Sequence, residues 1–386
     1  MAPRAYPFFR KVPLTTDTDT RHLERAIELA RRGDGHVSPN PLVGAVIADG
    51  DETLGEGFHG ELGGAHAEVE AIRSAGGRDL SHATLYVSLE PCCHQGRTPP
   101  CTDAILEAGI ARVVVASDDP SEHASGRGLG ILRDDGVEVV VAEGELAVRA
   151  RLLNQPFRKH ARTGRPWVLF KSAMSLDGKV ATRKGDSKWI SSAASRELAH
   201  HWRAASDAVA VGIGTAVADD PLLTARIDGL PIVRQPRRVV FDSLARLPLQ
   251  SKLVADARTI PLTVVVSRAA PRSATDVLES HGAEVIVATG ENEPARVRSA
   301  LDQLGADGVT SILLEGGPRL AGAFLDAGEI DEIRLFIAPL VIGGRSARDP
   351  LESEGVESIA DAVRPLMLTT EQLGTDLLVT ARILEW

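Results

Sequence analysis

The sequence predicts an α/β protein of two domains, and three observations lead to this prediction. The chain has 386 residues, more than one domain usually holds. Apolar residues alternate between helical spacing and short strand-like runs, as in helices packed on a sheet. A basic stretch with two prolines, residues 151–166, separates an earlier pattern from a later one. We therefore expect domains at 1–150 and 167–386 joined by a linker at 151–166, with about 1–20 as an N-terminal extension. The alternative is that 151–166 is a surface loop inside one large domain.

The first domain is expected to have three layers, with a sheet between helices. Each apolar run that reads as a strand is followed by a segment with apolar residues at helical spacing. Helices are expected at 19–33, 65–76, 101–110 and 128–136, and strands at 41–50, 83–90, 111–119 and 137–144.

The second region is expected to form another α/β domain with its own core. It opens with an apolar strand at 167–175 and a long loop at 175–192. No internal repeat or low-complexity tract interrupts it. Helices are expected at 195–208, 293–305 and 320–328, and strands at 209–214, 237–243, 262–267, 284–288, 310–317, 333–344 and 377–386.

Charge and cysteine content narrow the function classes. The formal net charge is −10, from 53 acidic and 43 basic residues, and this balance argues against a general nucleic-acid binder. Only three cysteines occur, all in one short window, so a reducing compartment is expected. The first twenty residues lack the apolar core of a secretory signal, and no apolar run reaches the ~20 residues of a membrane span. We expect a soluble cytoplasmic protein.

The strongest chemical signal combines His66-Ala67-Glu68 with the stretch PCCHQGRTPPC at 91–101. One histidine and two cysteine thiolates can hold zinc and leave the fourth tetrahedral position to water. Zinc acidifies that water and makes hydroxide available near neutral pH. A carboxylate that is not a ligand, here Glu68, can carry the proton from water to a leaving nitrogen. These residues predict a zinc-dependent hydrolytic deaminase.

The cysteine spacing leaves a choice of ligands. Zinc deaminases pair H-x-E with P-C-x-x-C, but here the third cysteine lies nine positions after Cys92. Cys92 with Cys93 is disfavoured, because adjacent side chains rarely converge on one tetrahedral ion. Cys92 with His94 is geometrically feasible. Cys92 with Cys101 is preferred, because the glycine- and proline-containing loop between them can return the chain to the metal.

Three stretches together resemble the deaminase domain of a bifunctional riboflavin-biosynthesis family. They are SPNPLVGAVI (38–47), HAEVEAI (66–72) and LEPCCHQGRTPPC (89–101). That family joins a diaminohydroxyphosphoribosylaminopyrimidine deaminase to a 5-amino-6-(5-phosphoribosylamino)uracil reductase. The resemblance implies a cytidine-deaminase-like three-layer α/β/α fold, and serine commonly stands in the family where this chain has Cys93. It implies zinc ligands at His66, Cys92 and Cys101, proton transfer by Glu68, and substrate contacts at Asn40, His59, His94 and Arg97.

Two glycine-containing stretches of the second domain are candidates for nucleotide binding. VGIGTAVADDP (211–221) has Val217 at the third glycine position of a dinucleotide fingerprint, which argues against a standard Rossmann site. In LLEGGPRLAG (313–322) a strand ends at Glu315-Gly316-Gly317, just before a helix begins. Glycines let a ligand approach the backbone, and the free N–H groups of a helix start favour an anion. The alternative is an ordinary tight turn.

The second domain resembles the reductase domain of the same family over nearly its full length. The matching stretches are FKSAMSLDGKVAT (170–182), DSKWIS (186–191), GTAVADDPLLTAR (214–226) and LLEGGPRLAGAFL (313–325). The resemblance implies a dihydrofolate-reductase-like α/β fold. It implies NADPH contacts at Ala173, Trp189, Thr215, Asp219, Ser243, Gly317, Pro318, Arg319, Leu320, Ala321, Gly322 and Ala323, and substrate contacts at Ser187, Arg203, Leu223, Arg226 and Glu315.

The side chains in these stretches suit such roles. Arg203 and Arg226 can clamp a substrate phosphate, and Glu315 can accept hydrogen bonds from the polar ring or ribose. Asp219 is the best candidate for ordering cofactor and substrate. Lys171 and Asp177 flank the expected site in the motif, with either a structural or a functional role.

We therefore expect a bifunctional enzyme that uses one Zn²⁺ per chain and NADPH. It would deaminate 2,5-diamino-6-ribosylamino-4(3H)-pyrimidinone 5′-phosphate and then reduce the ribose of 5-amino-6-(5-phosphoribosylamino)uracil to ribityl. The expected partners are small phosphorylated pyrimidines, without nucleic acid or membrane, and a homo-oligomer through the reductase domain is left open. One alternative is a nucleoside or tRNA-base deaminase with a non-catalytic C-terminal binding domain. Another is a structural zinc site with four protein ligands.

Overall fold

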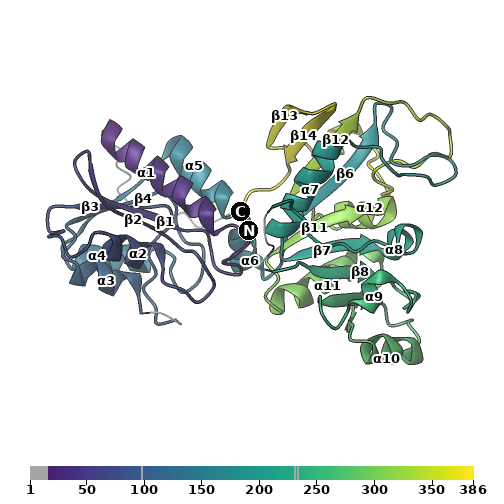
Figure 1. Cartoon of the computed structure of the whole chain (residues 1–386), viewed down its shortest axis with the longest axis horizontal. Coiled ribbons are helices and arrows are strands. Elements are labelled where there is room, and N and C mark those ends of the chain that lie inside the picture. Colours follow the sequence, from purple (N-terminus) through teal and green to yellow (C-terminus); the bar gives the residue numbers. More distant parts are fainter. Residues whose placement is uncertain (1–15, 97–98, 230–231, 233) are drawn as a thin grey trace. The chain divides into compact units, whose positions relative to one another are not determined.

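The computed structural model describes residues 16–96, 99–229, 232 and 234–386, and it divides into two compact units (Figure 1). The first unit is Met1–Arg162 with Trp386, and the second is Thr163–Glu385. Residues 151–163, part of the stretch that the sequence analysis assigns to a linker, are largely helical. Within the described ranges, none of the helices combines the length and the apolar character needed to cross a membrane.

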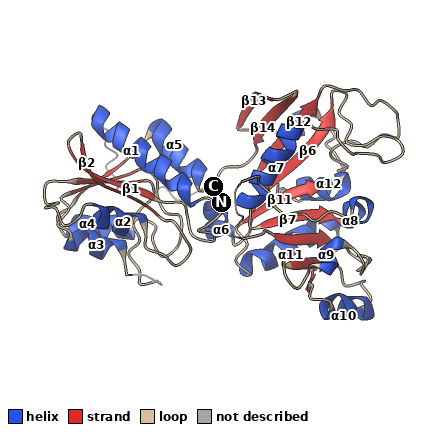
Figure 2. Cartoon of the chain, in the orientation of Figure 1, coloured by secondary structure: helices blue, strands red, loops and turns tan. Residues whose placement is uncertain are grey.

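The first unit is a five-stranded sheet with helices on both faces, which confirms the three-layer prediction (Figure 2). The strand order is β2-β1-β3-β4-β5; β1 runs antiparallel to β2 and β3, and β3, β4 and β5 are parallel. The strands are β1 (Gly44–Asp49), β2 (Glu52–Phe58), β3 (Thr84–Val87), β4 (Arg112–Val115) and β5 (Glu138–Val141). The helices are α1 (Asp17–Ala30), the 3₁₀ turn η1 (Arg31–Gly33), α2 (Ala67–Ser74), α3 (Cys101–Glu107), α4 (Arg127–Asp134), α5 (Gly144–Leu153) and α6 (Gln155–Thr163).

Strand β1 shows why its sequence is apolar without a polar alternation. Successive side chains of a strand point to opposite faces of the sheet. Ala45 and Ile47 pack with α2, α3 and α4, whereas Val46 and Ala48 pack with α1 and α5. Both faces of the strand are therefore buried, and both require apolar residues.

Strand β2 was not expected, because ETLGEGF contains mostly polar residues and glycine. It is an edge strand, and its first two residues are exposed. Burial therefore does not require apolar residues along most of its length, and its sequence shows little hydrophobic periodicity. A Cβ atom added at Gly57 would lie 2.4 Å from the backbone nitrogen of Ala71 in α2. Glycine at this position lets α2 pack directly on the sheet, and His66 immediately precedes that helix.

The second unit has a nine-stranded sheet in the order β10-β9-β8-β7-β11-β6-β12-β14-β13. Neighbouring strands are parallel from β10 through β9, β8, β7, β11 and β6 to β12. Strand β14 pairs antiparallel with β12, and β13 pairs antiparallel with β14. The strands are β6 (Trp167–Ser175), β7 (Ala208–Gly212), β8 (Arg237–Phe241), β9 (Leu262–Val266), β10 (Glu284–Val287), β11 (Ser311–Gly316), β12 (Glu332–Ala338), β13 (Met367–Leu373) and β14 (Asp376–Arg382). The helices are α7 (Ala193–Ala205), α8 (Ile213–Asp219), α9 (Lys252–Ala255), α10 (Arg272–Ser280), α11 (Glu293–Ala306), α12 (Pro318–Asp326) and the 3₁₀ turn η2 (Ile359–Asp361).

Two apolar clusters hold this unit together, one on each face of the sheet. Helices α11 and α12 bury Leu301 and Phe324 on one face, and α7 and α9 bury Trp202 and Leu253 on the other. Helices α8 to α10 and strand β13 were not expected from the sequence, and β7 ends at Gly212 rather than at residue 214. The parallel strands end at one edge of the sheet, which is where ligands bind in open α/β folds.

Candidate active sites

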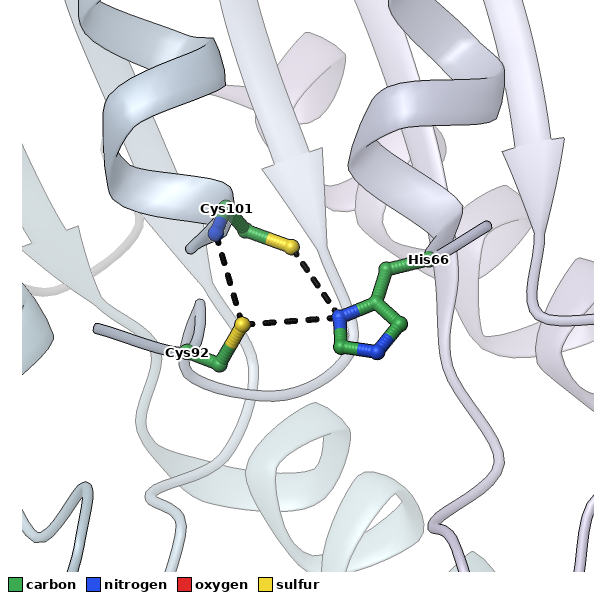
Figure 3. Close-up of side chains that lie close together, drawn as sticks. All are labelled: His66, Cys92 and Cys101. Carbon is green, nitrogen blue, oxygen red and sulfur yellow. Dashed lines mark hydrogen bonds between the residues drawn. The ribbon is translucent and has the colours of Figure 1, made fainter. Parts of the chain in front are cut away.

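The first candidate site is a cluster of one histidine and two cysteines in the first unit (Figure 3). His66 precedes α2, Cys101 is the first residue of α3, and Cys92 lies in the loop after β3. His66 Nδ1 lies 3.2 Å from Cys101 Sγ and 3.4 Å from Cys92 Sγ. One nitrogen and two sulfurs this close together are a zinc-like donor set with room for a fourth ligand. The structure thus brings together His66, Cys92 and Cys101, the ligand set that the sequence favoured over sets with Cys93 or His94.

The neighbouring residue Cys93 does not join this cluster. Its Sγ donates a hydrogen bond to the backbone oxygen of His123 at 3.6 Å. Within the cluster, the backbone nitrogen of Cys101 donates a hydrogen bond to Cys92 Sγ at 3.3 Å. This bond holds together the two ends of the loop that connects Cys92 to Cys101. Among the residues that the structure describes, only His66, Cys92 and Cys101 form a group able to hold a metal ion.

The two thiols of the cluster share a proton unequally. The Cys101 thiol donates a hydrogen bond to Cys92, and this bond is the main reason that the pKa of Cys92 is lowered to about 4. The same bond raises the pKa of Cys101, which is the donor. The hydrogen bond with Cys92 also raises the pKa of His66. The hydrogen bond therefore favours the thiolate form of Cys92, which is the form of cysteine that binds a metal ion.

Glu68 lies in the first turn of α2 and lines the same cavity as His66 and Cys92. Its residue surface is only 3% exposed. Burial, followed by the negative charge of Cys92, raises the pKa of the Glu68 carboxyl to about 7. A carboxyl with a pKa near the working pH can both accept and donate a proton, as a general acid–base must.

Asn40 and His59 form a second pair in this cavity. His59 Nδ1 lies 3.0 Å from the oxygen of Ala65, which can only accept, so Nδ1 carries the proton. His59 Nε2 then accepts from Asn40 Nδ2 at 3.0 Å. Burial lowers the pKa of His59, in agreement with a neutral ring. The amide of Asn40 is thereby oriented with its nitrogen toward His59, which leaves its oxygen to accept from a ligand.

The cavity around these residues measures about 430 Å³, which is enough for a pyrimidine with a sugar. His94 lines it, whereas Arg97 lies outside the described residues. Three further residues line the cavity that no sequence motif indicated, namely Asp119, His123 and Phe157. The ring centroid of His123 lies 5.5 Å from that of His94. No spacing rule links these residues to the metal motif, because they come from a different loop and from α6.

The second candidate site is a charged cluster at the end of β11 in the second unit. Glu315 accepts two hydrogen bonds from Arg203 of α7, of which that from Nη2 measures 2.7 Å, and Lys171 Nζ lies 3.8 Å away. Burial alone would raise the pKa of Glu315, but the charges of Arg203 and Lys171 lower it to about 2. Burial lowers the pKa of Lys171. The cluster is an ionised carboxylate held between two cations.

This geometry changes the expected role of Arg203. Its guanidinium is occupied by Glu315 and by the oxygen of Thr224, at 3.1 Å from Nη1. Arg226 is exposed and contacts Thr224 Oγ1 and the ring of His200, which the sequence analysis did not single out. Arg226 with His200 is therefore better placed than Arg203 to meet a substrate phosphate.

The charged cluster lines a cavity of about 660 Å³ that adjoins another of about 710 Å³. Thr215, Gly317 and Pro318 line both. Gly317 has a φ of +80° and connects the end of β11 at Gly316 to α12, whose first turn has no side-chain cap. The backbone N–H groups there are free to bind an anion such as a pyrophosphate. A neighbouring pair of cavities with this anion site fits a substrate beside a dinucleotide.

Most of the other expected contacts fall in these two cavities, and a few do not. Leu223 and Ala321 are buried in the core, and Gly322 packs against the backbone of Glu352. Asp177 accepts hydrogen bonds from the backbone of Ile342 and Gly343, which is a structural role. Residues lining the substrate-side cavity include Ala173, Ser187, Trp189 and Asp219, and those lining the other include Ser243, Arg319, Leu320 and Ala323.

Comparisons with known proteins place both units in families. A model described as the cytidine and deoxycytidylate deaminase zinc-binding region matches residues 16–117, and one described as the RibD C-terminal domain matches residues 166–379. The riboflavin biosynthesis protein RibD of Actinobacillus pleuropneumoniae is 41% identical over 364 residues, which cover 94% of this chain and 95% of the relative. The chain belongs to the RibD family. The Escherichia coli RibD protein is 38% identical over 372 residues, covering 93% of this chain and 97% of the relative.

Solved structures of RibD proteins agree with this assignment. Acinetobacter baumannii RibD matches with a TM-score of 0.84 at 38% identity, covering 95% of this chain and 99% of that one. A second match is a Thermotoga maritima protein described as a diaminohydroxyphosphoribosylaminopyrimidine deaminase/5-amino-6-(5-phosphoribosylamino)uracil reductase. It has a TM-score of 0.81 at 34% identity, and the match covers 95% of this chain and 99% of that one. The chain is a bifunctional deaminase and reductase of riboflavin biosynthesis, with a zinc-binding deaminase domain.

Proposed function

We propose that the first unit hydrolytically deaminates 2,5-diamino-6-ribosylamino-4(3H)-pyrimidinone 5′-phosphate. The observation that carries this proposal is the metal-ligand cluster His66, Cys92 and Cys101 in one cavity with the buried Glu68. The identity of the substrate is taken from the deaminase activity for which the related Thermotoga maritima protein is described. The orientation of Asn40, which presents an amide oxygen as an acceptor, suits the donor edge of a diaminopyrimidine.

In the proposed reaction, His66, Cys92 and Cys101 hold one zinc ion. A bound zinc ion supplies Lewis acidity, which lowers the pKa of water at the position left by the three protein ligands. Glu68 takes the proton released from water and delivers it to the leaving nitrogen, for which its raised pKa is suited. Asn40, held by the neutral His59, orients the pyrimidine ring against this centre.

We propose further that the second unit reduces the ribose of 5-amino-6-(5-phosphoribosylamino)uracil to ribityl with NADPH. The nicotinamide supplies the hydride when the cofactor is bound. The chain positions the two reactants: the first turn of α12 takes the pyrophosphate, and Arg226 with His200 takes the substrate phosphate. Glu315 stays ionised at neutral pH and accepts hydrogen bonds from the substrate, whereas Lys171 donates them.

A two-step assay tests the proposal. Full-length protein with bound zinc is incubated with the diaminopyrimidine phosphate, and ammonia should be released without NADPH. NADPH added afterwards should be oxidised in an amount equal to the ammonia released. Glu68→Ala should abolish ammonia release but still oxidise NADPH when supplied with the deaminated pyrimidine. Ammonia release that persists in this variant would refute the role of Glu68.

We also propose that two copies of the chain associate through the second unit. Strand β13 is the last strand of the sheet order, and exposed apolar side chains gather beside it at Leu366, Met367 and Leu368. An exposed apolar edge strand is a surface that pairs with another chain. Light scattering should give twice the mass of the chain, and Leu368→Lys should reduce that mass to one copy.

A cytoplasmic location is proposed on the chemistry of the cysteines. Cys92, Cys93 and Cys101 are all free thiols, and two of them serve the proposed metal site. Such thiols persist in a reducing compartment.

A further inference from the structure

A loop of the first unit, residues 116–126 between β4 and α4, forms part of the cavity that holds the metal-ligand cluster. Asp119, Ser121 and His123 of this loop line the cavity. Asp119 Oδ1 accepts a hydrogen bond from the backbone nitrogen of Ser121 at 2.8 Å, so the two residues are held together in one turn. The polar groups that this loop offers to a substrate therefore depend on how the loop is anchored.

Arg158 of α6 anchors the start of the loop. Its Nη1 donates hydrogen bonds to the backbone oxygen of Asp118 at 2.7 Å and to Ser117 Oγ at 3.2 Å, and its Nη2 lies 3.2 Å from Asp118 Oδ1. The Arg158 side chain is only 1% exposed. Among the described residues that line the cavity, α6 contributes Phe157 but not Arg158. Arg158 can therefore act on a substrate only through the loop that it holds.

The third nitrogen of the Arg158 guanidinium binds Trp386. Its Nε donates to the backbone oxygen of Trp386 at 2.6 Å. Gln155, also on α6, bonds the same residue twice: Nε2 donates to that oxygen at 3.2 Å, and Oε1 accepts from the backbone nitrogen of Trp386 at 2.9 Å. Lys159 Nζ lies 5.4 Å from the centroid of the Trp386 ring, which is within cation–π range. Three buried side chains of α6 thus hold Trp386 in place.

Trp386 provides an acceptor that the rest of the first unit does not. It belongs to that unit although it is 228 positions from Arg158 in the chain. Within the described part of the chain, Arg158 Nε has no other hydrogen-bond acceptor. A buried donor without a partner is unfavourable, so the guanidinium would have to turn if Trp386 were absent. Such a rotation would weaken its hydrogen bonds to Ser117 and Asp118.

The other end of the loop is anchored separately. The buried carboxylate of Glu90 accepts hydrogen bonds from the backbone nitrogen of Gly126 at 2.9 Å and from that of Asp119 at 3.4 Å. Glu90 lies two positions before Cys92, so these bonds tie the loop to the segment that carries a metal ligand. Loss of the Arg158 contacts would therefore change the alignment of the loop and leave the metal ligands in place.

We propose that Arg158 is a positioning residue of the deaminase reaction and that Trp386 holds it in its working orientation. The inference rests on the proposed function, because it takes the cavity around the metal-ligand cluster to be the deaminase site. Trp386 orients the guanidinium, the guanidinium fixes the start of the loop, and the loop presents its polar groups to the substrate. A residue that follows the whole reductase unit in the chain thereby contributes to substrate binding by the deaminase unit.

Steady-state kinetics of ammonia release by the full-length protein with bound zinc tests this role. Arg158→Met should raise the KM for the diaminopyrimidine phosphate roughly 10- to 100-fold, the range for a small misplacement of binding groups, and change kcat less than about threefold. Arg158→Lys should recover part of the loss, because it keeps the charge and loses the planar fork. A variant that lacks Trp386 should raise KM at least about threefold, although it removes no residue that contacts the loop.

The two activities of the chain and one matched arginine supply the controls. Oxidation of NADPH with the deaminated pyrimidine should be unchanged in every variant, because the second unit is intact. Arg162→Met removes an exposed arginine of the same helix and should leave KM unchanged. Zinc content should stay at the wild-type level, and the pH profile of kcat, which reports Glu68, should not shift. Thermal unfolding of every variant checks that the fold is retained.

The outcomes separate this inference from the proposed function. If Arg158→Met and the variant lacking Trp386 both keep the wild-type KM, the inference is wrong and the deaminase function stands. A loss of zinc at unchanged KM would show a purely structural role and overturn the inference too. If Arg158→Met does not fold, the variant lacking Trp386 decides by the same criterion. An effect of Arg158→Met alone would refute the part assigned to Trp386. Wild-type protein that releases no ammonia would refute the proposed function, and the inference with it.

Discussion

The buried ion pair of Glu315 and Arg203 gives a stability prediction that does not depend on catalysis. Glu315 is in the interior, with its side chain 6% exposed, and Arg203 from α7 donates two hydrogen bonds to it. Arg203→Met removes this partner and leaves an ionised carboxylate with only Lys171, 3.8 Å away. Removing one member of a buried ion pair leaves an uncompensated charge, which costs about 3–5 kcal/mol.

The pKa of Glu315 gives an independent magnitude. Its value is about 2 in the folded protein against 4.5 for the free side chain. A difference of about 2.5 units corresponds to roughly 3 kcal/mol in favour of the ionised form at neutral pH. Because the folded pKa is lowered, this stabilisation is complete above about pH 4.5 and declines as the pH falls toward 2.

A double-mutant cycle in urea, followed by tryptophan fluorescence at pH 7, measures the effect. Three of the four tryptophans lie in the second unit, and Trp202 directly precedes Arg203. Arg203→Met and Glu315→Gln should each lower the free energy of unfolding by about 3 kcal/mol. The double variant should lose at least about 1.5 kcal/mol less than the sum, because it leaves no uncompensated Glu–Arg charge. Additivity within about 0.5 kcal/mol would refute the reasoning.

Further predictions concern the metal site, a buried arginine and acid stability. Cys92→Ser should lower the zinc content measured by atomic absorption to a small fraction of one per chain, whereas Cys93→Ser should leave it unchanged, since Cys93 Sγ bonds a backbone oxygen instead. Arg238 is fully buried, and its Nε and Nη1 have no hydrogen-bond partner, so Arg238→Met should be neutral or raise the melting temperature; a loss above about 2 kcal/mol would contradict this. Arg112, chiefly by its hydrogen bond, lowers the pKa of the buried Asp19 below 3.8. The stability lost in Asp19→Asn should therefore be about 2 kcal/mol near pH 7 and shrink as the pH falls below 3.8, as measured by urea unfolding at several pH values.

Much of the fold could be predicted because burial imposes periodicity on the sequence. Strand β1 is apolar throughout because helices cover both of its faces. Strands β2 and β13 were missed because they lie at sheet edges, where exposed side chains carry no such constraint. Helix α10 was missed for a related reason, since it buries only Leu278.

The metal ligands could be proposed because their identities restrict the chemistry. A histidine and cysteine thiolates are the ligands that zinc prefers, and an H-x-E sequence places Glu68 within one turn of the ligand His66. The choice of Cys101 over Cys93 as the second thiol was favoured by loop composition and by family resemblance. The role of Arg203 was less accessible, because a guanidinium suits a carboxylate as well as a phosphate.

By itself, the sequence determined which kinds of chemistry this chain can perform. The order of His66, Glu68, Cys92 and Cys101 predicts a zinc-dependent deaminase, and the β11–α12 junction at Gly317 predicts an anion site. These signals are local, since a few neighbouring residues carry each of them.

Only the tertiary structure decided which distant groups act together. Arg203 and Glu315 are 112 residues apart in the chain, yet they form one ion pair. Arg246 and Arg296 come from distant parts of the chain but line one cavity. Sheet order and helix packing determine these proximities, and spacing along the chain does not encode them. For the same reason His123 and the pairing of Arg226 with His200 became apparent only in the folded chain.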